Sequence, residues 1–337
     1  MADTFKFRID HHGSLVRPPE LLAARASFAV GRLDAAGLRA VEDASIAEAV
    51  RKQRRLGLTA VTDGEFRRAD LRGAVFDAVR GFRYVEADRW AAEGELKPER
   101  SLVADDVAAL TELTRIPAKA TLPSPAWLAA RTYVPGGVWG SVRELGLALA
   151  AIVRDEIGAV VAAGVRYVQI DNPGYAGPLT GAGGGIDLEE AIEIDSLAVA
   201  LGDKPSDVRI GLCPLFRATG ADRAVAEKLF ASVPVDRWNL PFDKGTEAEV
   251  TLLRAVPAEK DVCLGIVDPA VAELEEIDLI MDRMDVAGAV RDLEDVAVSP
   301  SAGFSPVAGG NLIGAEEQWR KLIHVETIAR MCWGNEL

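Results

Sequence analysis

The chain of 337 residues is poor in the residues that form disulfides and metal sites, with three cysteines and three histidines. Cys213, Cys263 and Cys332 are far apart and odd in number, which favours a reduced, cytoplasmic protein. The sequence contains no CxxC or HExxH motif, so spacing alone identifies no metal centre.

The sequence also lacks an excess of positive charge and long apolar runs. It has 38 basic and 52 acidic side chains, a formal net charge of -14. A surface this acidic repels phosphate backbones and anionic lipids, so we expect neither a nucleic-acid nor a membrane partner. No stretch approaches the roughly 20 apolar residues of a membrane span, and the N-terminus has no signal-peptide pattern. We expect a small-molecule substrate, and the sequence leaves homo-oligomer formation open.

Short apolar, β-branched runs alternate with longer helical patterns along the chain. The eight candidate strands are KFRIDHH, LTAVTDGE, AKATLPSP, VRYVQID, VRIGLCPLF, RWNLPFD, DVCLGIVD and VAVSPSAGF. This alternation predicts parallel strands joined by right-handed crossovers, and eight units favour a TIM (β/α)8 barrel forming one domain over residues 1–337. The length beyond about 250 residues falls mainly within 80–118, which we expect to be an insertion over the carboxyl ends of the strands.

Polar side chains gather where the predicted strands end, which is where TIM barrels carry their active sites. They are His12, Ser14, Asp63, Glu65, Ser124, Asp171, Asn172, Cys213, Asp243, Asp268, Ser299 and Ser301. Carboxylates dominate the set, and they suit an amine, a protonated nitrogen heterocycle or a metal ion. Any one acid could instead cap the following helix. Capping is a weak explanation for the whole set, so together these residues predict an active site at the carboxyl ends of the strands.

Two of the three histidines, His11 and His12, stand side by side just before Gly13. Neighbouring side chains of an extended segment point to opposite faces, so one of them can serve a buried site while the other does not. By this alternation His12 shares its face with Ser14. An imidazole is the usual general acid or base near neutral pH. The alternatives are that His12 only hydrogen-bonds the inserted segment, or that His11 faces the site instead.

Five segments, DHHGSLVRPPELLAAR, GLTAVTDGEFRR, KATLPSP, VRYVQIDNP and LIHVETIARMCWG, resemble the cobalamin-independent methionine synthase family. The likeness covers nearly the whole chain and is closest to single-barrel members related to the C-terminal catalytic domain. The resemblance implies a TIM barrel. In methionine synthase this barrel binds homocysteine and moves a methyl group from a methyl-folate to its thiolate, which a zinc ion held by His, Cys, Glu and Cys activates.

The resemblance implies that the substrate site is retained. Ser14 matches the Gly-Ser turn that holds the carboxylate end of the substrate. Glu65 and Asp171 match the two acids that hold its amine, and we group His11 and Asn172 with these binding residues. His11 matches a family residue, whereas His12 replaces an apolar one.

The family's zinc ligands are largely replaced. Gly211, Pro241 and Ala302 stand at three ligand positions, and only Cys213 matches. One thiolate cannot hold zinc in a four-coordinate site, so we expect no metal and no other cofactor. Asp243 is the only nearby replacement donor in the sequence.

These observations lead to three hypotheses about function. The first is an enzyme that performs metal-free acid/base chemistry, as a lyase, hydrolase or decarboxylase, on a small amino-acid-like or sulfur-containing substrate, with His12, Asp243 and Cys213 as catalytic residues. The second is a methyl or alkyl transferase acting on a thiol, for which a folate could serve as donor. The third is a non-catalytic small-molecule-binding protein. All three predict that Ser14, Glu65, Asp171 and Cys213 converge on one cavity.

Overall fold

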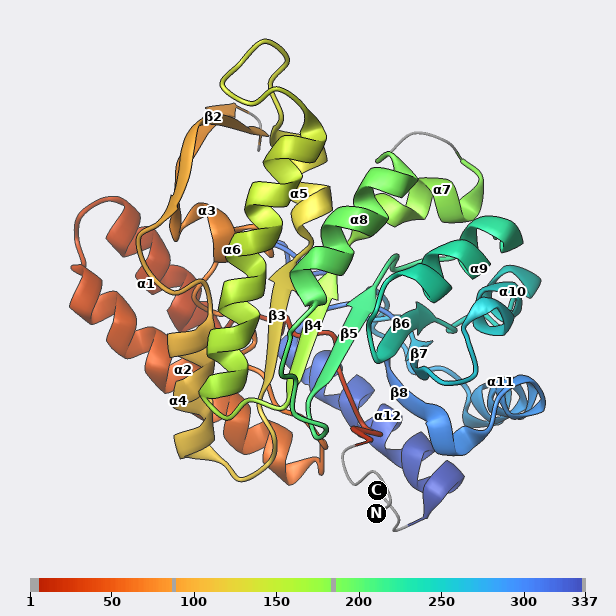
Figure 1. Ribbon diagram of the computed structural model, residues 1–337. Helices are drawn as coiled ribbons and strands as arrows, with labels where there is room; N and C mark the ends of the chain where they lie inside the picture. Colours follow the sequence, from red (N-terminus) through yellow and green to blue (C-terminus); the bar gives the residue numbers. More distant parts are fainter. Residues whose placement is uncertain (1–5, 87–88, 183–185, 335–337) are drawn as a thin grey trace.

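A parallel sheet of six strands forms the centre of the computed structural model, which describes residues 6–86, 89–182 and 186–334 (Figure 1). Each strand pairs with the next one in the chain. The strands are β3 (Lys119–Pro123), β4 (Tyr167–Asp171), β5 (Arg209–Cys213), β6 (Arg237–Pro241), β7 (Asp261–Val267) and β8 (Val296–Pro300). Helices surround the sheet (Figure 1). Parallel strands with helical crossovers place the chain in the predicted class of TIM-barrel folds.

The first two predicted strands are shorter than the sequence indicates. Ile9 forms a single parallel bridge with Val298 of β8, and Val61 forms another with Ala118, next to β3. The amide of Thr59 donates to the carbonyl of Ile9 at 3.0 Å, which joins the two segments. The two edges of the sheet are thus linked through single residues rather than regular strands. The backbone soon leaves the extended conformation, because the glycines that follow, 13 and 64, have φ of +141° and +69°.

Several of the helices begin where a short polar side chain accepts from a free amide group of the first turn. Ser124, Ser141 and Asp222 each accept a hydrogen bond from an amide in the first turn of the following helix, and Thr246 forms a capping box with Glu249. None of the described helices is long and apolar enough to cross a membrane. The α-helices are α1 (Pro19–Ala29), α2 (Ala35–Arg55), α3 (Gly73–Phe76), α4 (Ala104–Leu113), α5 (Pro125–Thr132), α6 (Val142–Ala162), α7 (Ala176–Thr180), α8 (Leu188–Val199), α9 (Arg223–Ser232), α10 (Glu247–Ala255), α11 (Ile277–Val290) and α12 (Ala315–Trp333), with short 3-10 turns at η1 (Pro173–Tyr175) and η2 (Leu293–Asp295).

The predicted insertion contains an antiparallel hairpin of β1 (Val79–Glu86) and β2 (Arg89–Pro98). Trp90 of β2 stacks on Phe76 with ring centroids 4.6 Å apart, and it shares a cavity with Trp127 of α5. This places the hairpin beside the carboxyl ends of the strands, towards which β3 and β5 point (Figure 1). The second half of the range 80–118 forms α4, which packs against α6 in the outer helical layer. The assignment of residues 1–337 to one domain remains a prediction.

The interior of the sheet contains a buried ion pair. The Nζ atom of Lys119 lies 2.9 and 2.8 Å from the two carboxylate oxygens of Asp10, and the Tyr167 hydroxyl donates to Asp10 at 2.9 Å. Burial alone would raise the pKa of Asp10. The nearby positive charges, chiefly the Lys119 ammonium, lower it by more than burial raises it, so the carboxyl group has a pKa below its usual value. Lys119 also donates to the carbonyl of His11 at 2.7 Å, and the pair thus holds the segment that carries both histidines.

Candidate active site

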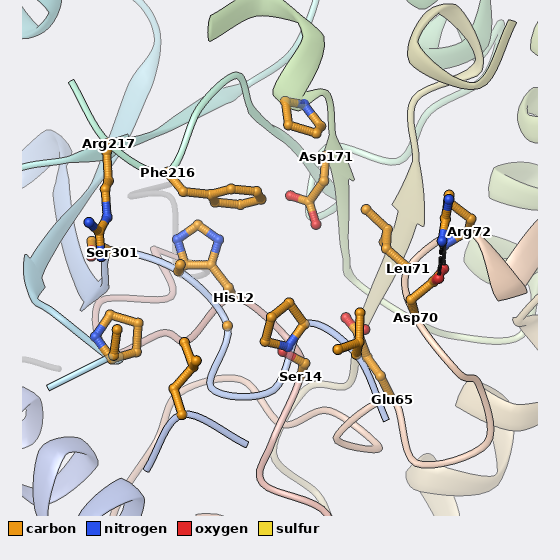
Figure 2. A pocket seen from close by; sticks show the side chains of 18 of the residues that line it. His12, Ser14, Glu65, Asp70, Leu71, Arg72, Asp171, Phe216, Arg217 and Ser301 are labelled. Atoms are coloured by element: carbon orange, nitrogen blue, oxygen red, sulfur yellow. Dashed lines mark hydrogen bonds and ion pairs between the residues drawn. The ribbon is translucent and has the colours of Figure 1, made fainter. Parts of the chain in front are cut away.

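A cavity of about 430 Å³ opens at the carboxyl ends of the strands. Its wall combines the segment after Ile9, the turn after Val61, the end of β4 and the loops after β5 and β8 (Figure 2). Most of the exposed area of the wall is apolar, as in typical small-molecule sites. Its charged groups are the carboxylates of Glu65, Asp70, Asp171 and Asp268 and the guanidinium groups of Arg72, Arg131 and Arg217. Four of the polar residues in the wall were predicted from the sequence as site residues: His12, Ser14, Glu65 and Asp171.

Glu65 reaches the cavity through a tight turn of the sequence DGE. Gly64 and Glu65 both have positive φ, of +69° and +60°, and the Asp63 carboxylate accepts from the amide of Glu65 at 2.9 Å. Positive φ in a glutamate costs about 1–3 kcal/mol and is typical of functional sites. The Oε1 atom of Glu65 accepts from the Thr121 hydroxyl at 2.9 Å and lies 3.5 Å from the Arg68 guanidinium. The turn therefore fixes a carboxylate at the cavity wall.

Asp171 is the last residue of β4, and its side chain projects into the same cavity (Figure 2). Burial raises the pKa of its carboxyl group to about 7, and the negative charge of Glu65 adds to this rise. Two carboxylates that face one buried space stabilise a cation placed between them, because the cation offsets their repulsion. The cavity is therefore suited to a ligand with a positive charge.

Gln169, which the sequence analysis did not identify, connects the two sides of the site. Its amide nitrogen donates to Asp171 at 2.7 Å and to the carbonyl of His12 at 3.1 Å. Its amide oxygen accepts from Asn239 at 2.7 Å. Gln169 has 0 % exposure, and buried polar side chains require partners. In the sequence, the only trace of this role is a polar residue inside the apolar run YVQID.

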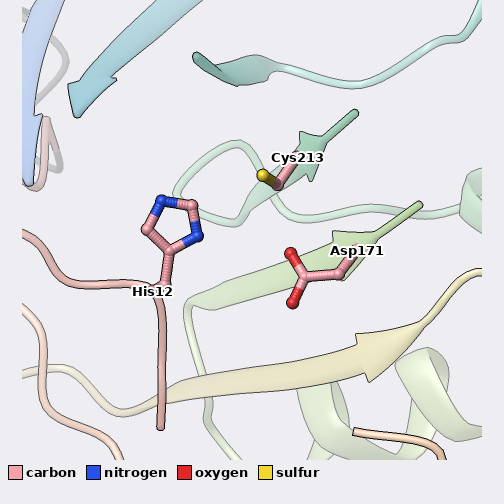
Figure 3. A group of neighbouring side chains, drawn as sticks. All are labelled: His12, Asp171 and Cys213. Atoms are coloured by element: carbon pink, nitrogen blue, oxygen red, sulfur yellow. The ribbon is translucent and has the colours of Figure 1, made fainter. Parts of the chain in front are cut away.

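His12 and Cys213 lie next to Asp171 (Figure 3). Burial lowers the pKa of His12 to about 3, and the positive charge of Lys119 contributes, so the imidazole is neutral at pH 7. Burial and the charge of Asp171 raise the pKa of the Cys213 thiol well above its usual value. The Phe216 ring lies edge-on to the His12 ring, with centroids 5.9 Å apart, and covers it.

Three other residues selected from the sequence lie elsewhere. His11 points away from the cavity, and its Nε2 atom lies 2.9 Å from Oε1 of Gln53 in α2. Asn172 donates to Asp195 at 2.7 Å and so connects the segment after β4 to α8. The Asp243 carboxylate pairs with Lys244 at 2.8 Å. None of the three is among the described residues that line the cavity.

Several other predicted residues come together at the cavity, which Asp268 and Ser301 also line, whereas Asp63, Ser124 and Ser299 are not among the described residues of its wall. Ser14, Glu65 and Asp171 line the cavity, and Cys213 adjoins it through its contact with Asp171 and His12. The Ser14 hydroxyl accepts from the amide of Ser305 at 3.3 Å. The alternation of the first segment also holds, because His12 and Ser14 share one face and His11 takes the other.

A second cavity of about 830 Å³ adjoins the first. The two share Arg72, Trp127, Arg131 and Pro173 in their walls. The second cavity differs because no carboxylate is among the described residues that line it. Its other aromatic and basic residues are Phe76, Arg89 and Trp90.

Comparison with known proteins identifies the family. Residues 12–313 match the family of the cobalamin-independent synthase catalytic domain, and the chain belongs to that family. The match includes every cavity residue described above. It establishes a methionine-synthase-like protein without fixing the reaction.

Similar proteins agree with this assignment. The uncharacterised protein YxjH of Bacillus subtilis is 28% identical over 97% of this chain and 95% of its own length. A Listeria monocytogenes structure, provisionally described as a vitamin-B12 independent methionine synthase, is 28% identical, covers 98% of both chains and has a TM-score of 0.81. The structure of a B12-independent methionine synthase from Shewanella sp. W3-18-1 in complex with selenomethionine has a TM-score of 0.79, and the match covers 97% of both chains. Because its sequence is only 18% identical, it supports the fold alone.

A curated methyltransferase shares only part of its length with this chain. The 5-methyltetrahydropteroyltriglutamate–homocysteine methyltransferase of a Synechococcus strain is 25% identical over 87% of this chain but only 39% of its own length. The alignment thus leaves most of that larger protein unmatched.

The resemblance assigns the zinc positions to Gly211, Cys213, Pro241 and Ala302, and of these only Cys213 carries a donor side chain. A side chain at Gly211 would bring its Cβ atom to 3.3 Å from both the Asn239 oxygen and the Tyr167 ring, so these neighbours would have to shift by a few tenths of an ångström.

Proposed function

We propose that this protein is an enzyme that transfers a methyl or other alkyl group between a donor and the sulfur of a small amino-acid-like substrate. The observation that carries the proposal is the pair of adjoining cavities. The first, the acidic cavity, has the carboxylates of Glu65 and Asp171 in its wall, and the second is larger and is lined by three aromatic rings and three arginines. Two such spaces with a shared wall suit a reaction with two substrates.

The acidic cavity supports recognition of an amino acid. The carboxylate of Glu65 accepts hydrogen bonds from a substrate ammonium group, and charge-assisted hydrogen bonds of this kind are the strong ones. The Ser14 hydroxyl donates to the substrate carboxylate. A side chain at Gly303 would collide with the Ser14 oxygen, so glycine keeps this contact open.

The second cavity supports a flat, negatively charged donor. Trp90 and Trp127 offer ring faces for stacking, while Arg72, Arg89 and Arg131 offer positive charge. A folate is a donor of this chemical class. The balanced reaction is R–SH + CH3–D → R–S–CH3 + H–D, in which the S–C bond forms as the C–D bond breaks and its electron pair remains on the donor.

Metal-free acid/base chemistry through His12 has less support. A histidine with a pKa of about 3 carries no proton to donate at pH 7 and is a weak base. Asp243, the second catalytic candidate from the sequence, pairs with Lys244 outside the described cavity wall. A lyase, hydrolase or decarboxylase would therefore have to use Asp171, with its pKa of about 7, rather than His12 or Asp243 as the proton carrier.

The test uses the purified full-length chain with L-homocysteine and 5-methyltetrahydrofolate, and mass spectrometry detects the S-methyl product. We expect product with wild type and a reduced rate with Glu65→Gln. Product formed from a single substrate without any donor would restore the acid/base hypothesis. Tight binding of L-homocysteine without turnover across a panel of alkyl donors would make the protein a binding protein.

A further inference from the structure

Three buried donor side chains meet at the inner end of the acidic cavity. They are His12, Asp171 and Cys213, with exposed fractions of 6 %, 6 % and 1 %. One ring nitrogen, one carboxylate oxygen and the thiol sulfur all lie within 4.8 Å of one another. Figure 3 shows the three side chains pointing towards one another from three different segments.

The fold brings these residues together although they are distant in the sequence. Asp171 and Cys213 are paired residues on neighbouring strands, β4 and β5. His12 comes from the first bridge segment and faces both of them. Three atoms that lie 4.8 Å apart at most can all be about 2.8 Å from a common centre, whereas zinc bonds are about 2.0–2.3 Å long. Side-chain rotations that move each donor atom by about half an ångström would shorten these distances to the length of zinc bonds.

The donor set has the composition of a catalytic zinc site. Such sites combine three protein ligands of nitrogen, sulfur or oxygen type with one open position. A thiolate selects zinc over magnesium and calcium. We propose that His12, Asp171 and Cys213 bind one divalent metal ion, Zn²⁺ by donor preference, with the open position towards the cavity.

This ligand set differs from that of the family. It keeps Cys213 but takes its nitrogen from His12, where the family has an apolar residue, and its oxygen from Asp171. Gly211 cannot supply the nitrogen, because a side chain there would meet Asn239 and Tyr167. The expectation from the sequence that no metal binds was based on Asp243 as the only replacement donor. It did not include His12 of the first segment.

The surroundings of the cluster favour a positive ion. The Cys213 thiol has one polar contact, 3.4 Å from the carbonyl oxygen of Leu215, and Asp171 faces the charge of Glu65. Gln169 donates both to Asp171 and to the carbonyl of His12, as residues behind metal ligands commonly do. A bound Zn²⁺ would supply the activation of a substrate thiol as thiolate.

Cobalt provides a direct test, because Co²⁺ bound to a thiolate gives an intense charge-transfer absorption. Purified wild type is stripped with a chelator, checked for folding by circular dichroism and titrated with Co²⁺ and then with competing Zn²⁺, while elemental analysis gives the stoichiometry. We expect one ion per chain and a charge-transfer band that Zn²⁺ removes.

Variants identify the ligands. Cys213→Ser should abolish the band, and His12→Ala and Asp171→Asn should each weaken metal binding by more than the roughly 10–100-fold typical of residues behind the ligands. Cys263→Ser and Cys332→Ser are the matched thiol controls and should keep the band, since neither belongs to the cluster. A folded wild type without saturable binding, or a band that survives in Cys213→Ser, would overturn the proposal. The Co²⁺ titration uses no substrate, so failure of the metal site can be distinguished from failure of the proposed transferase function.

Discussion

Replacing Lys119 by methionine should destabilise the protein strongly, and the structure gives the magnitude. Lys119 and Asp10 both have side chains with 0% exposure, and the ammonium lies 2.8 Å from the carboxylate. Removing one member of a buried ion pair leaves the other charge without compensation and costs about 3–5 kcal/mol. Exposure of zero means that solvent screening does not reduce this value. The Tyr167 hydroxyl and the more distant Arg237 charge remain near Asp10, which places the expectation at the lower end.

Equilibrium unfolding in urea, followed by circular dichroism, measures the effect. The double variant Asp10→Asn with Lys119→Met removes both charges and should recover much of the loss, because a neutral pair leaves no isolated buried charge. A single Lys119→Met variant that loses less than about 1 kcal/mol, the centre of the range for ordinary substitutions, would refute the role assigned to this pair.

The same pair predicts the pH dependence of stability. Because the Asp10 pKa is lower in the folded than in the unfolded protein, its contribution is present above the unfolded value of about 3.9 and is lost as the pH falls through the folded value. The stability advantage of wild type over Lys119→Met should therefore shrink as the pH falls below about 4, because the wild-type contribution is lost there and protonation neutralises the isolated Asp10 of the variant. A difference in unfolding free energy between the two proteins that stays constant or grows between pH 7 and pH 3 would contradict this account.

Three further predictions concern the site. Glu65→Gln should weaken binding of L-homocysteine by about 10–150-fold, the equivalent of a lost charged hydrogen bond of 1.5–3 kcal/mol, and calorimetry with an analogue lacking the amine should show no such loss. Gly211→His should fail to create a stronger metal site and should lower stability by about 1–3 kcal/mol through overpacking, as urea unfolding and Co²⁺ titration can check. His11→Ala should lower stability through the lost contact with Gln53 while the Co²⁺ spectrum stays unchanged, whereas a lost spectrum would place His11 in the metal site.

Much of the fold was predictable because periodicity and turn residues are local signals. The strands from β3 to β8 follow apolar runs in the sequence, and their polar ends mark the site. The first two strands were predicted too long, since their apolar residues resemble strands while Gly13 and Gly64 bend the backbone soon after a single bridge. The sequence shows both glycines, but it does not show how many residues pair before the turn.

The site was predictable to the extent that strand ends and alternation determine it. The common face of His12 and Ser14 follows from alternation, and the position of Asp171 follows from the end of its strand. Asp243 was selected for its nearness in sequence to a family ligand position, but its side chain pairs with Lys244. Gln169 was missed because a single polar residue in an apolar strand carries no periodic signal; its partners become visible only in three dimensions.

The position of His12 shows how the proposed metal site would assemble without the ligand positions that the family resemblance implies. Asp171 and Cys213 are paired across β4 and β5, so their side chains share a location that the sheet itself fixes. The only further requirement is a nitrogen donor opposite them, and the first segment passes there because Gln169 holds the carbonyl of His12 at 3.1 Å. A histidine at this one position brings three donor atoms within 4.8 Å, without any change at the crowded position of Gly211. In the proposed site, the pairing of β4 with β5 and the course of the first segment therefore determine where the metal ion would bind in this chain.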